Sequence, residues 1–218
     1  MRQPPFSFLE GTPFPASFLQ GASGKRPLLL QGTEPRLGIF THRILACHLL
    51  DPLQPMSSCI IVCGDNVFRP DILMQESRKA GTDPRTLLSR IHISRTVTIH
   101  QFHTLVLSRL GKRIADTRAS LILLSGILPL FSDGAVPERE SLTLFSSIMA
   151  ELPAILLDQA PLCLIPVDRH EAESDRRSRR LFSLLESSSD SRNLVAPPST
   201  VRTGERRKSG RLFGTSEN

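Results

Sequence analysis

Asp65 is the residue whose type and position most directly suggest chemistry. It lies in the segment CIIVCGDNVFRPDIL, which runs from Cys59 to Leu73 and combines an apolar run, a Gly-Asp-Asn turn and a Phe-Arg-Pro sequence that opens a helix. In α/β proteins, ligands bind outside the carboxyl ends of the strands. A carboxylate placed there can act in catalysis, but aspartate is also a frequent hydrogen-bond acceptor within turns. The local sequence leaves both roles open for Asp65.

Histidines and cysteines form the second group of candidates. His42, Cys47 and His48 share one predicted helix, and His100 and His103 are three residues apart on another. Such pairs can bind metal, but neither a CxxC nor an HExxH motif supports them, and a Cys–His nucleophile is equally unsupported. All four cysteines lie within apolar segments, a pattern typical of reduced core thiols: Cys47, Cys59, Cys63 and Cys163. We therefore predict no metal site.

The elements that must position these residues follow from the hydrophobic pattern. Short apolar or alternating runs predict strands at 26–32, 59–64, 91–95, 120–124 and 161–167. Amphipathic segments predict helices at 37–50, 69–81, 83–91, 98–116, 140–152 and 175–188. Three further edge strands are predicted at 193–197, 199–205 and 209–214. Unbroken apolar strands that alternate with amphipathic helices predict an α/β fold with a mainly parallel sheet and helices on both faces.

Length and composition set the expected domain organisation. The 218 residues suffice for one domain with a hydrophobic core, and the 17 prolines crowd the two ends. We predict a flexible Pro-rich N-terminal arm (1–26), a core domain (27–195) and a basic C-terminal segment (196–218) made of edge strands or a flexible tail. No apolar run approaches the roughly 20 residues that span a bilayer, and the N-terminus is too rich in proline for a signal peptide. The expected location is cytoplasmic, with no membrane partner.

Three short blocks of the sequence resemble the ATPase core of the RecA recombinase family, and above all its archaeal and eukaryotic strand-exchange proteins. The blocks are Phe68-Arg69-Pro70 at the start of a helix, Ser94-Arg95 at the end of a strand, and His100-Gln101 at the start of the next helix. The resemblance is specific over residues 66–101 and follows only the order of elements over the rest of 28–185. It implies a RecA-like fold, ATP and Mg²⁺ as ligands of an active member, DNA as a partner, and self-assembly through a Phe-bearing extended segment.

The nucleotide-binding residues of such an ATPase are largely missing. A phosphate loop needs G-x-x-x-x-G-K-[ST], in which the lysine contacts the β- and γ-phosphates and the hydroxyl binds Mg²⁺. At the corresponding place the chain reads GTEPRLGIFTHR: Gly32 and Gly38 are separated by five residues, Ile39 and Phe40 replace the lysine and the hydroxyl, and Thr41 follows one residue late. Loss of the lysine contact costs about 1.5–3 kcal/mol. Gly32, Gly38 and Thr41 thus form a degenerate nucleotide-binding loop, and no cofactor is expected.

The remaining catalytic positions are weakened as well. The strand that corresponds to the metal-binding Walker B strand ends in Ser125-Gly126, and the nearest acid, Asp133, has the sequence context of a turn residue. Asp65 corresponds to the family's water-activating glutamate and is one methylene shorter. We interpret Asp65 as an acceptor within its turn; it would be a general base only if the chain were an active ATPase.

Arginines are the better candidates for a binding function. Lysine and arginine outnumber aspartate and glutamate by 27 to 21, and the isoelectric point is about 9.8. One cluster falls in and after the place where the family has a DNA-facing loop: Arg169, Arg176, Arg177, Arg179 and Arg180. A second cluster lies in the C-terminal segment and includes Arg206, Arg207 and Lys208. Arginine binds phosphate through its planar fork and stacks on bases, which suits single-stranded DNA, although interleaved acidic residues leave a solvated helix face as the other interpretation of the first cluster.

The sequence therefore favours a non-catalytic RecA-like protein of DNA recombination or repair. Such a protein would bind DNA, preferably single-stranded, through the two arginine clusters. It would bind a recombinase-like partner or a second copy of itself through the apolar arm, PPFSFLEGTPFPASF. One alternative is an active DNA-dependent ATPase with a variant phosphate loop, in which Asp65 is the base. A second alternative is a regulatory scaffold for protein interactions.

Overall fold

Six strands form one sheet in which every neighbouring pair is parallel, in the order β3-β2-β4-β5-β1-β6. The computed structural model describes residues 26–52, 55–65, 67–157 and 161–193. The strands are β1 (Leu28–Gly32), β2 (Ser58–Cys63), β3 (Ile91–Arg95), β4 (Ala119–Ser125), β5 (Leu162–Asp168) and β6 (Asp190–Asn193). The predicted α/β class with a parallel sheet is confirmed.

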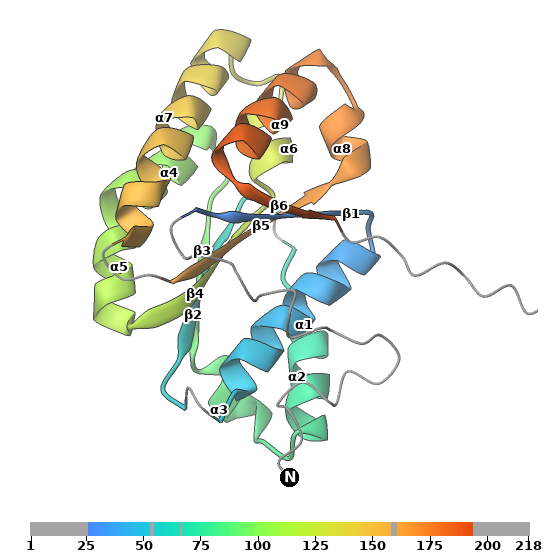
Figure 1. Ribbon diagram of the computed structural model, residues 1–218, viewed down its shortest axis with the longest axis vertical. Coiled ribbons are helices and arrows are strands. Elements are labelled where there is room, and N and C mark those ends of the chain that lie inside the picture. The colour runs from blue at the N-terminus through green and yellow to red at the C-terminus, as the bar shows by residue number, and fades with distance from the viewer. Residues whose placement is uncertain (1–25, 53–54, 66, 158–160, 194–218) are drawn as a thin grey trace, which may run out of the picture.

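Helices cover both faces of this sheet, as predicted. Figure 1 shows α1, α2 and α3 on one side and the later helices on the other. The first group is α1 (Arg36–Leu50), α2 (Pro70–Lys79) and α3 (Pro84–Leu88). The second group is α4 (Ile99–Thr104), the π-helical segment η2 (Leu105–Arg109), α5 (Leu110–Thr117), α6 (Ile127–Ser132), α7 (Glu138–Leu157), α8 (Arg169–Glu173) and α9 (Arg176–Ser188).

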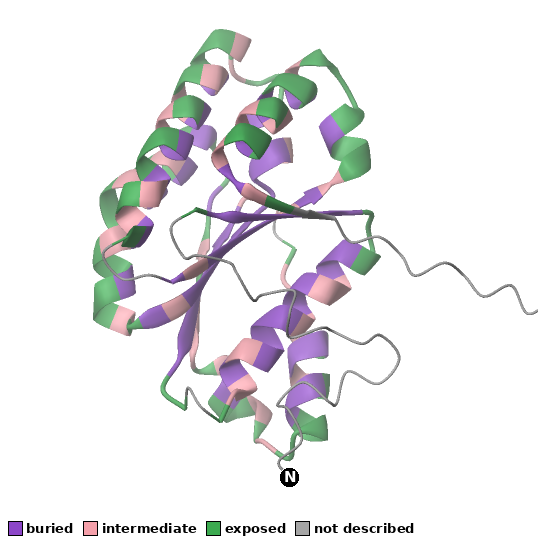
Figure 2. Ribbon diagram, viewed as in Figure 1, coloured by how far each residue is buried: buried purple, intermediate pink, exposed green. Residues whose placement is uncertain are grey.

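Alternation along the strands divides the hydrophobic core into two layers. In β1, Leu29 belongs to the layer on the α4–α9 side, and Leu28 and Leu30 belong to the layer on the α1–α3 side. Successive side chains of a strand point to opposite faces, so a strand covered on both faces must be apolar at every position. Figure 2 shows the buried residues concentrated on the strands and on the sheet-facing sides of the helices. This is why β2 and β4, inside the sheet, could be recognised from their apolar runs.

Several helix ends carry the residues that favour such ends. Pro70 is the first residue of α2, and Gly81, just beyond its end, has a φ of +67°. Asp83 caps α3, because its carboxylate accepts the backbone N–H of Arg85 at 3.2 Å. These helix ends were predicted correctly from the sequence. They set the bounds of α2 and α3, the two helices that connect β2 to β3.

Three short elements were not predicted, in addition to the π-helical segment η2, which divides the helix predicted at 98–116. α6 lies within the run SLILLSGILPLF, where Gly126 adopts a φ of +64° and ends the strand so that a helix can begin. α8 has only five residues, Arg169–Glu173, which is too short for an amphipathic pattern. β6 has the polar sequence DSRN and lies at the edge of the sheet. The edge strands predicted at 199–205 and 209–214, and most of the one at 193–197, lie outside the described residues.

The helix α7 is longer than its sequence predicted. The helix was predicted over 140–152, directly before Pro153, and a proline inside a helix removes one helical hydrogen bond. The helix continues through Pro153 to Leu157, and this extra turn buries Leu156 in the core. Within the described residues, α7 is also the one helix whose length and apolar composition would allow it to cross a membrane. Its buried side chains, among them Phe145 and Leu152, belong to the core layer beside the sheet.

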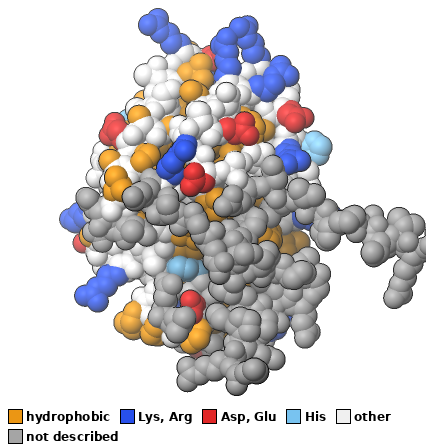
Figure 3. Space-filling view, viewed as in Figure 1, with side chains coloured by type: hydrophobic (Ala, Val, Ile, Leu, Met, Phe, Trp, Pro, Cys, Tyr) orange, Lys and Arg blue, Asp and Glu red, His pale blue; other side chains and the backbone are white. Residues whose placement is uncertain are grey.

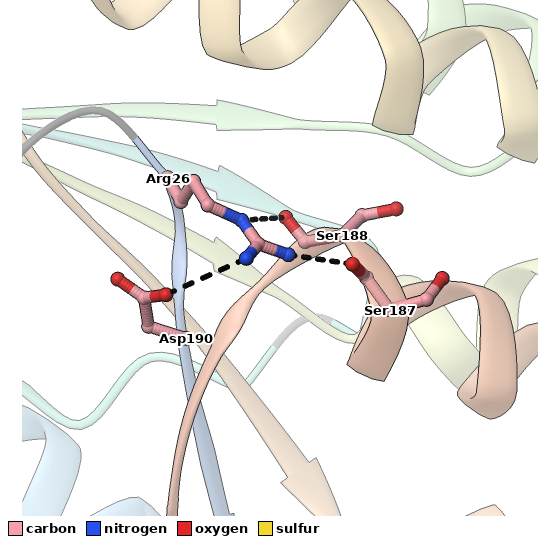
Figure 4. A network of polar contacts seen from close by, with 4 residues as sticks. All are labelled: Arg26, Ser187, Ser188 and Asp190. Atoms are coloured by element: carbon pink, nitrogen blue, oxygen red, sulfur yellow. Dashed lines mark hydrogen bonds and ion pairs between the residues drawn. The ribbon is translucent and has the colours of Figure 1, made fainter.

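Arg26 ties the beginning of the sheet to its edge, as Figure 4 shows. Its guanidinium donates to the backbone carbonyls of Ser187 and Ser188, at 2.5 Å and 3.3 Å, and lies 3.8 Å from a carboxylate oxygen of Asp190. Those carbonyls end α9, where a cation is favourable because the carbonyl end of a helix carries negative partial charge. One side chain thus holds β1, the end of α9 and the start of β6 together.

Candidate functional site

The carboxyl ends of the parallel strands meet at one edge of the sheet, where the sequence places its catalytic candidates. Gly32 at the end of β1 is in register with Asp168 at the end of β5. Cys63 at the end of β2 is in register with Ser125 at the end of β4, and Asp65 follows two residues later. Gly32, Asp65 and Asp168 therefore lie at the edge where α/β proteins bind ligands.

The helix α1 begins at this edge, and a carboxylate of the chain itself covers its N-terminus. The carboxylate of Glu34 lies at the backbone N–H of Gly38, which lowers the pKa of Glu34 against the effect of burial. A methyl group built on Gly38 would meet the two Glu34 carboxylate oxygens at 3.0 and 3.2 Å, which shows how closely the carboxylate lies. The N-terminus of a helix is the place where phosphate loops bind phosphate. In this chain Glu34 occupies it.

The neighbouring backbone N–H groups are also engaged. Leu37 donates to the carbonyl of Thr33 at 3.1 Å, and Ile39 donates to the carbonyl of Pro35 at 3.2 Å. The N–H of Glu34 itself donates to the carboxylate of Asp168 at 3.0 Å. A phosphate loop works because such N–H groups point at the ligand. Here they are satisfied within the loop and by β5.

Thr41 does not reach this loop. Its hydroxyl donates to the backbone carbonyl of Leu37 at 2.8 Å, one helical turn earlier, and the residue is buried. Gly32 is the last residue of β1, and Gly38 lies in the first turn of α1. The sequence showed that the lysine is missing, but not that Thr41 faces into its own helix or that Glu34 fills the loop.

Four carboxylates give this edge a negative field. Burial raises the pKa of Glu34, and the charges of Asp168 and Asp65 add to the effect, while the Gly38 N–H and Arg69 oppose it. Burial likewise raises the pKa of Glu171, with Asp168, Asp65 and Glu34 adding to the shift. Carboxylates that perturb one another in this way lie close together. A polyphosphate at this edge would meet charges of its own sign.

Asp65 has the contacts of a turn acceptor. Its Oδ1 accepts the backbone N–H of Val67 at 3.0 Å and the hydroxyl of Ser125 at 3.2 Å. The thiol of Cys63 lies 3.5 Å from the same oxygen, and burial raises the pKa of that thiol. Asp65 thus connects the turn after β2 to the end of β4.

The remaining metal and nucleophile candidates have structural contacts. All four cysteines are free and buried, and burial raises the pKa values of Cys47 and Cys163 to about 12. His103 contacts the hydroxyl of Ser147 at 2.8 Å, and His100 lies 3.4 Å from Glu140, so both face α7. In the part of the chain that the structure describes, no group of three or more His, Cys, Asp and Glu side chains is arranged to hold a metal ion.

His42 has a role that the sequence did not reveal. Its Nε2 accepts the backbone N–H of Arg69 at 3.1 Å, so the ring proton lies on Nδ1, which donates to the carbonyl of Gly38 at 2.8 Å. The ring also packs at 5.8 Å from that of Phe68. His42 is buried, and it joins the first turn of α1 to the Phe-Arg-Pro segment that opens α2. The sequence places His42 one helical turn after Gly38, but this spacing alone did not identify the backbone of Arg69 as the partner of His42.

Lowering the pH from 7.5 to 5.5 is expected to reduce the free energy of unfolding, in part through His42. Burial, together with Arg69, lowers its pKa below the ordinary 6.5, against the opposing effects of the Gly38 hydrogen bond, Asp71 and Asp65. Below about pH 6.5 the unfolded chain binds the proton more readily than the folded chain does. The stabilisation is therefore complete above that pH and is lost as the pH falls, by at most about 1.4 kcal/mol per pH unit for one group.

Urea denaturation of wild type and His42→Gln at the two pH values tests this expectation. The variant should show a smaller loss on acidification. Some pH dependence will persist, because burial also lowers the pKa of His48, whose Nε2 lies 2.7 Å from the hydroxyl of Ser120. An equal loss in wild type and variant would contradict the assignment of His42.

Some arginines of the first cluster hold neighbouring elements together, and others are exposed. Arg177 donates to the backbone carbonyl of Val136 at 2.9 Å, and Arg180 donates to Glu138 at 2.6 Å, so both hold the start of α9 against the loop before α7 and the start of α7. Arg176 and Arg179 are exposed. Arg169 is exposed in α8 and has a polar or electrostatic contact of its own. Arg206, Arg207 and Lys208 lie outside the described residues, as does the N-terminal arm.

A groove beside this cluster was missed by the sequence analysis. It has a volume of about 600 Å³ and is lined by Glu138, Arg139, Leu142, Thr143 and Ser146 of α7 and by Arg180 of α9. The α7 residues 139, 142, 143 and 146 follow the spacing of one helix face. That spacing was the available signal, but the helix was predicted to begin at 140, after Arg139.

Sequence comparisons add no relative to these observations. No protein-family model matches the chain, and no curated protein matches it either.

Proposed function

We propose that the chain is a non-catalytic RecA-like protein that acts in DNA recombination or repair by binding DNA, a recombinase-like partner, or both. The observation that carries the non-catalytic part is the Glu34 carboxylate at the N-terminus of α1. A P-loop ATPase needs that place for the phosphates of its nucleotide. Here the chain supplies its own anion and surrounds it with further carboxylates.

The architecture supports a RecA-like core over a dinucleotide-binding domain. The dinucleotide-binding order 3-2-1-4-5-6 places β1 beside β2. In this chain β4 and β5 separate β1 from β2, and β1 pairs with β5 and β6. The Phe68-Arg69-Pro70 block opens α2, Ser94-Arg95 ends β3, and His100-Gln101 lies in the first turn of α4, so each block occupies the element in which the resemblance expects it.

The proposed partners follow from charge and from the terminal segments. Single-stranded DNA is the proposed polyanion, because arginine forks suit phosphates and bases. It would contact the exposed arginines of α8 and α9 and the basic residues 206–208. A recombinase-like partner or a second copy would contact the apolar arm within residues 1–26. The proposed protein needs no bound cofactor, has no membrane partner and acts in the cytoplasm.

Filter binding of a labelled single-stranded oligonucleotide at 50 and 200 mM salt, with and without Mg·ATP, tests this proposal. We expect binding that weakens by an order of magnitude or more as the salt is raised, because phosphate contacts release counterions. Binding should be the same with and without Mg·ATP. Binding that requires ATP would favour the active ATPase instead. Absence of salt-sensitive binding, together with absence of a partner in a pull-down, would refute the proposal.

A further inference from the structure

We propose that the groove between α7 and α9 binds the phosphodiester backbone of a nucleic acid. This inference rests on the proposed function and names the surface that performs it. The surface differs from the one expected from the sequence, because it includes Arg139 of α7, which no motif singled out, and because it does not require Arg177 as a contact.

The topology brings two helix N-termini to the same end of the molecule. α7 connects β4 to β5, and α9 connects β5 to β6. Since these strands are parallel, both helices run back against the strand direction, and both begin at the edge where the strands end. The two helices pack against each other. Each N-terminus carries about half a positive charge, which acids of the chain itself offset in part: Glu138 and Glu140 lie in the first turn of α7, and Asp175 caps α9.

The charged side chains around the groove are mainly arginines. Arg139 of α7 and Arg180 of α9 lie on its two sides. Arg176 and Arg179 are exposed on the first turn of α9. Figure 3 shows Lys and Arg side chains gathered at the end of the molecule where α7 and α9 begin. These cations supply the charge complementarity that a phosphodiester backbone needs.

Nearby acids are already engaged by other groups of the chain. Glu138, the acidic residue of the groove lining, is paired with Arg180 at 2.6 Å. Asp175 caps α9 by accepting the N–H of Ser178 at 2.9 Å, and Glu140 lies 3.4 Å from His100. Glu173 is exposed in α8. These carboxylates keep their charge, so the positive excess around the groove is one: five arginines (139, 176, 177, 179 and 180) against four acids (138, 140, 173 and 175).

Arg177 adds positive charge beneath this surface. One of its terminal nitrogens bonds the carbonyl of Val136, directly before α7, at 2.9 Å. Its other two guanidinium nitrogens are buried and have no hydrogen-bond partner within the described ranges. Arg177 therefore positions the start of α9 and leaves a cation there that no hydrogen-bonded carboxylate neutralises.

The chemistry of the lining points to phosphate contacts without base recognition. The Arg139 fork matches phosphate oxygens, the Arg180 fork is shared with Glu138, and the hydroxyl of Ser146 is a further polar group. Leu142 offers an apolar surface for sugars. None of the described side chains that line the groove is aromatic, so bases have no platform on which to stack. We expect binding that is independent of base sequence and steeply dependent on salt.

Fluorescence anisotropy with the full chain tests the groove directly. Labelled single-stranded and double-stranded oligonucleotides of mixed sequence are titrated at several salt concentrations with wild type, with Arg139→Gln/Arg180→Gln and with Arg78→Gln/Arg85→Gln. Arg78 and Arg85 are exposed at α2 and α3, on the opposite side of the sheet, so the control removes the same charge elsewhere. Thermal unfolding of each variant verifies that it is folded.

The groove variant should bind at least 10-fold more weakly than wild type at 50 mM salt, and its salt slope should fall by roughly 1 to 2. The control should stay within about 2- to 3-fold of wild type. The oligonucleotide form bound more tightly identifies whether the ligand is single- or double-stranded. If wild type binds but both variants bind alike, the groove assignment is wrong while the proposed function stands. If wild type does not bind either oligonucleotide, both fail. Displacement of DNA by polyglutamate at equal charge concentration would overturn the groove as a nucleic-acid site and favour an acidic peptide.

Discussion

Replacing Gly126 by alanine is expected to lower the free energy of unfolding by about 2–5 kcal/mol. Gly126 follows β4 with a φ of +64°, a conformation that disfavours any residue with a Cβ atom. A methyl group at this position would also lie 2.4 Å from the Cβ and 2.5 Å from the backbone nitrogen of Asp65. Strain and overlap therefore act together, and the overlap involves backbone that a rotamer change cannot move.

Two hydrogen bonds hold the turn after β2 close to the turn after β4. The backbone N–H of Gly64 donates to the carbonyl of Ser125 at 2.9 Å, and Asp65 accepts the hydroxyl of Ser125. A methyl group on Gly126 would push these turns apart and break both bonds. The change would therefore act on the carboxyl edge of the sheet as well as on stability.

Gly81 supplies a matched control for Gly126→Ala. Its φ is +67°, nearly the same, but a methyl group there would have no atom within 4 Å. Gly81→Ala should therefore cost only the backbone strain, about 1–2 kcal/mol. Urea denaturation of the two variants separates strain from overlap. Equal losses at the two sites would mean that the Asp65 turn can move aside, contrary to the close approach described here.

Truncating Phe131 to alanine is expected to cost about 3–5 kcal/mol. Phe131 is fully buried in α6, and its ring meets those of Phe102 and Phe145 edge to face, with centroids 5.9 Å and 5.3 Å apart. Edge-to-face pairs add stability beyond the burial of apolar area. Alanine would leave a cavity between α4, α6 and α7 and remove both ring contacts.

Phe131→Leu and Phe182→Ala test this explanation of the Phe131 effect. Leucine keeps most of the volume, so its cost should fall clearly below that of alanine. Phe182 is only partly buried at the margin of the same core layer, so its truncation should also cost less. Chemical denaturation of the three variants gives the comparison. A Phe131→Ala protein as stable as Phe182→Ala would show that the three-ring cluster does not stabilise α6 on the sheet.

Much of the fold follows from local sequence signals. β1 and β3 were predicted because Leu28–Leu30 is a short apolar run stopped by Gly32 and because Ile91–Arg95 alternates. β6 was missed because its sequence is polar, and only pairing with β1 makes it a strand. The π-helical segment Leu105–Arg109 was missed because its apolar pattern is that of an ordinary helix. Elements defined by their own residues were predictable, and elements defined by their neighbours were not.

The candidate site, like the fold, could be predicted only in part from the sequence. The sequence shows that Ile39 and Phe40 stand where a lysine and a hydroxyl would be needed, because spacing alone reveals a missing residue. It does not show that Glu34 lies at the N–H of Gly38, because that contact depends on the conformation of the loop. Likewise, it reveals an arginine cluster at 176–180, but not that Arg139 of another helix faces Arg180 across a groove.

We propose that the Glu34 carboxylate occupies the place where a nucleotide phosphate would bind and that the protein therefore does not bind ATP there. Calorimetric titration of the full chain with Mg·ATP, at millimolar nucleotide, tests it most directly. We predict no saturable heat for wild type. Saturable one-site binding at micromolar ATP, abolished when the loop is altered by Gly38→Val, would contradict the claim.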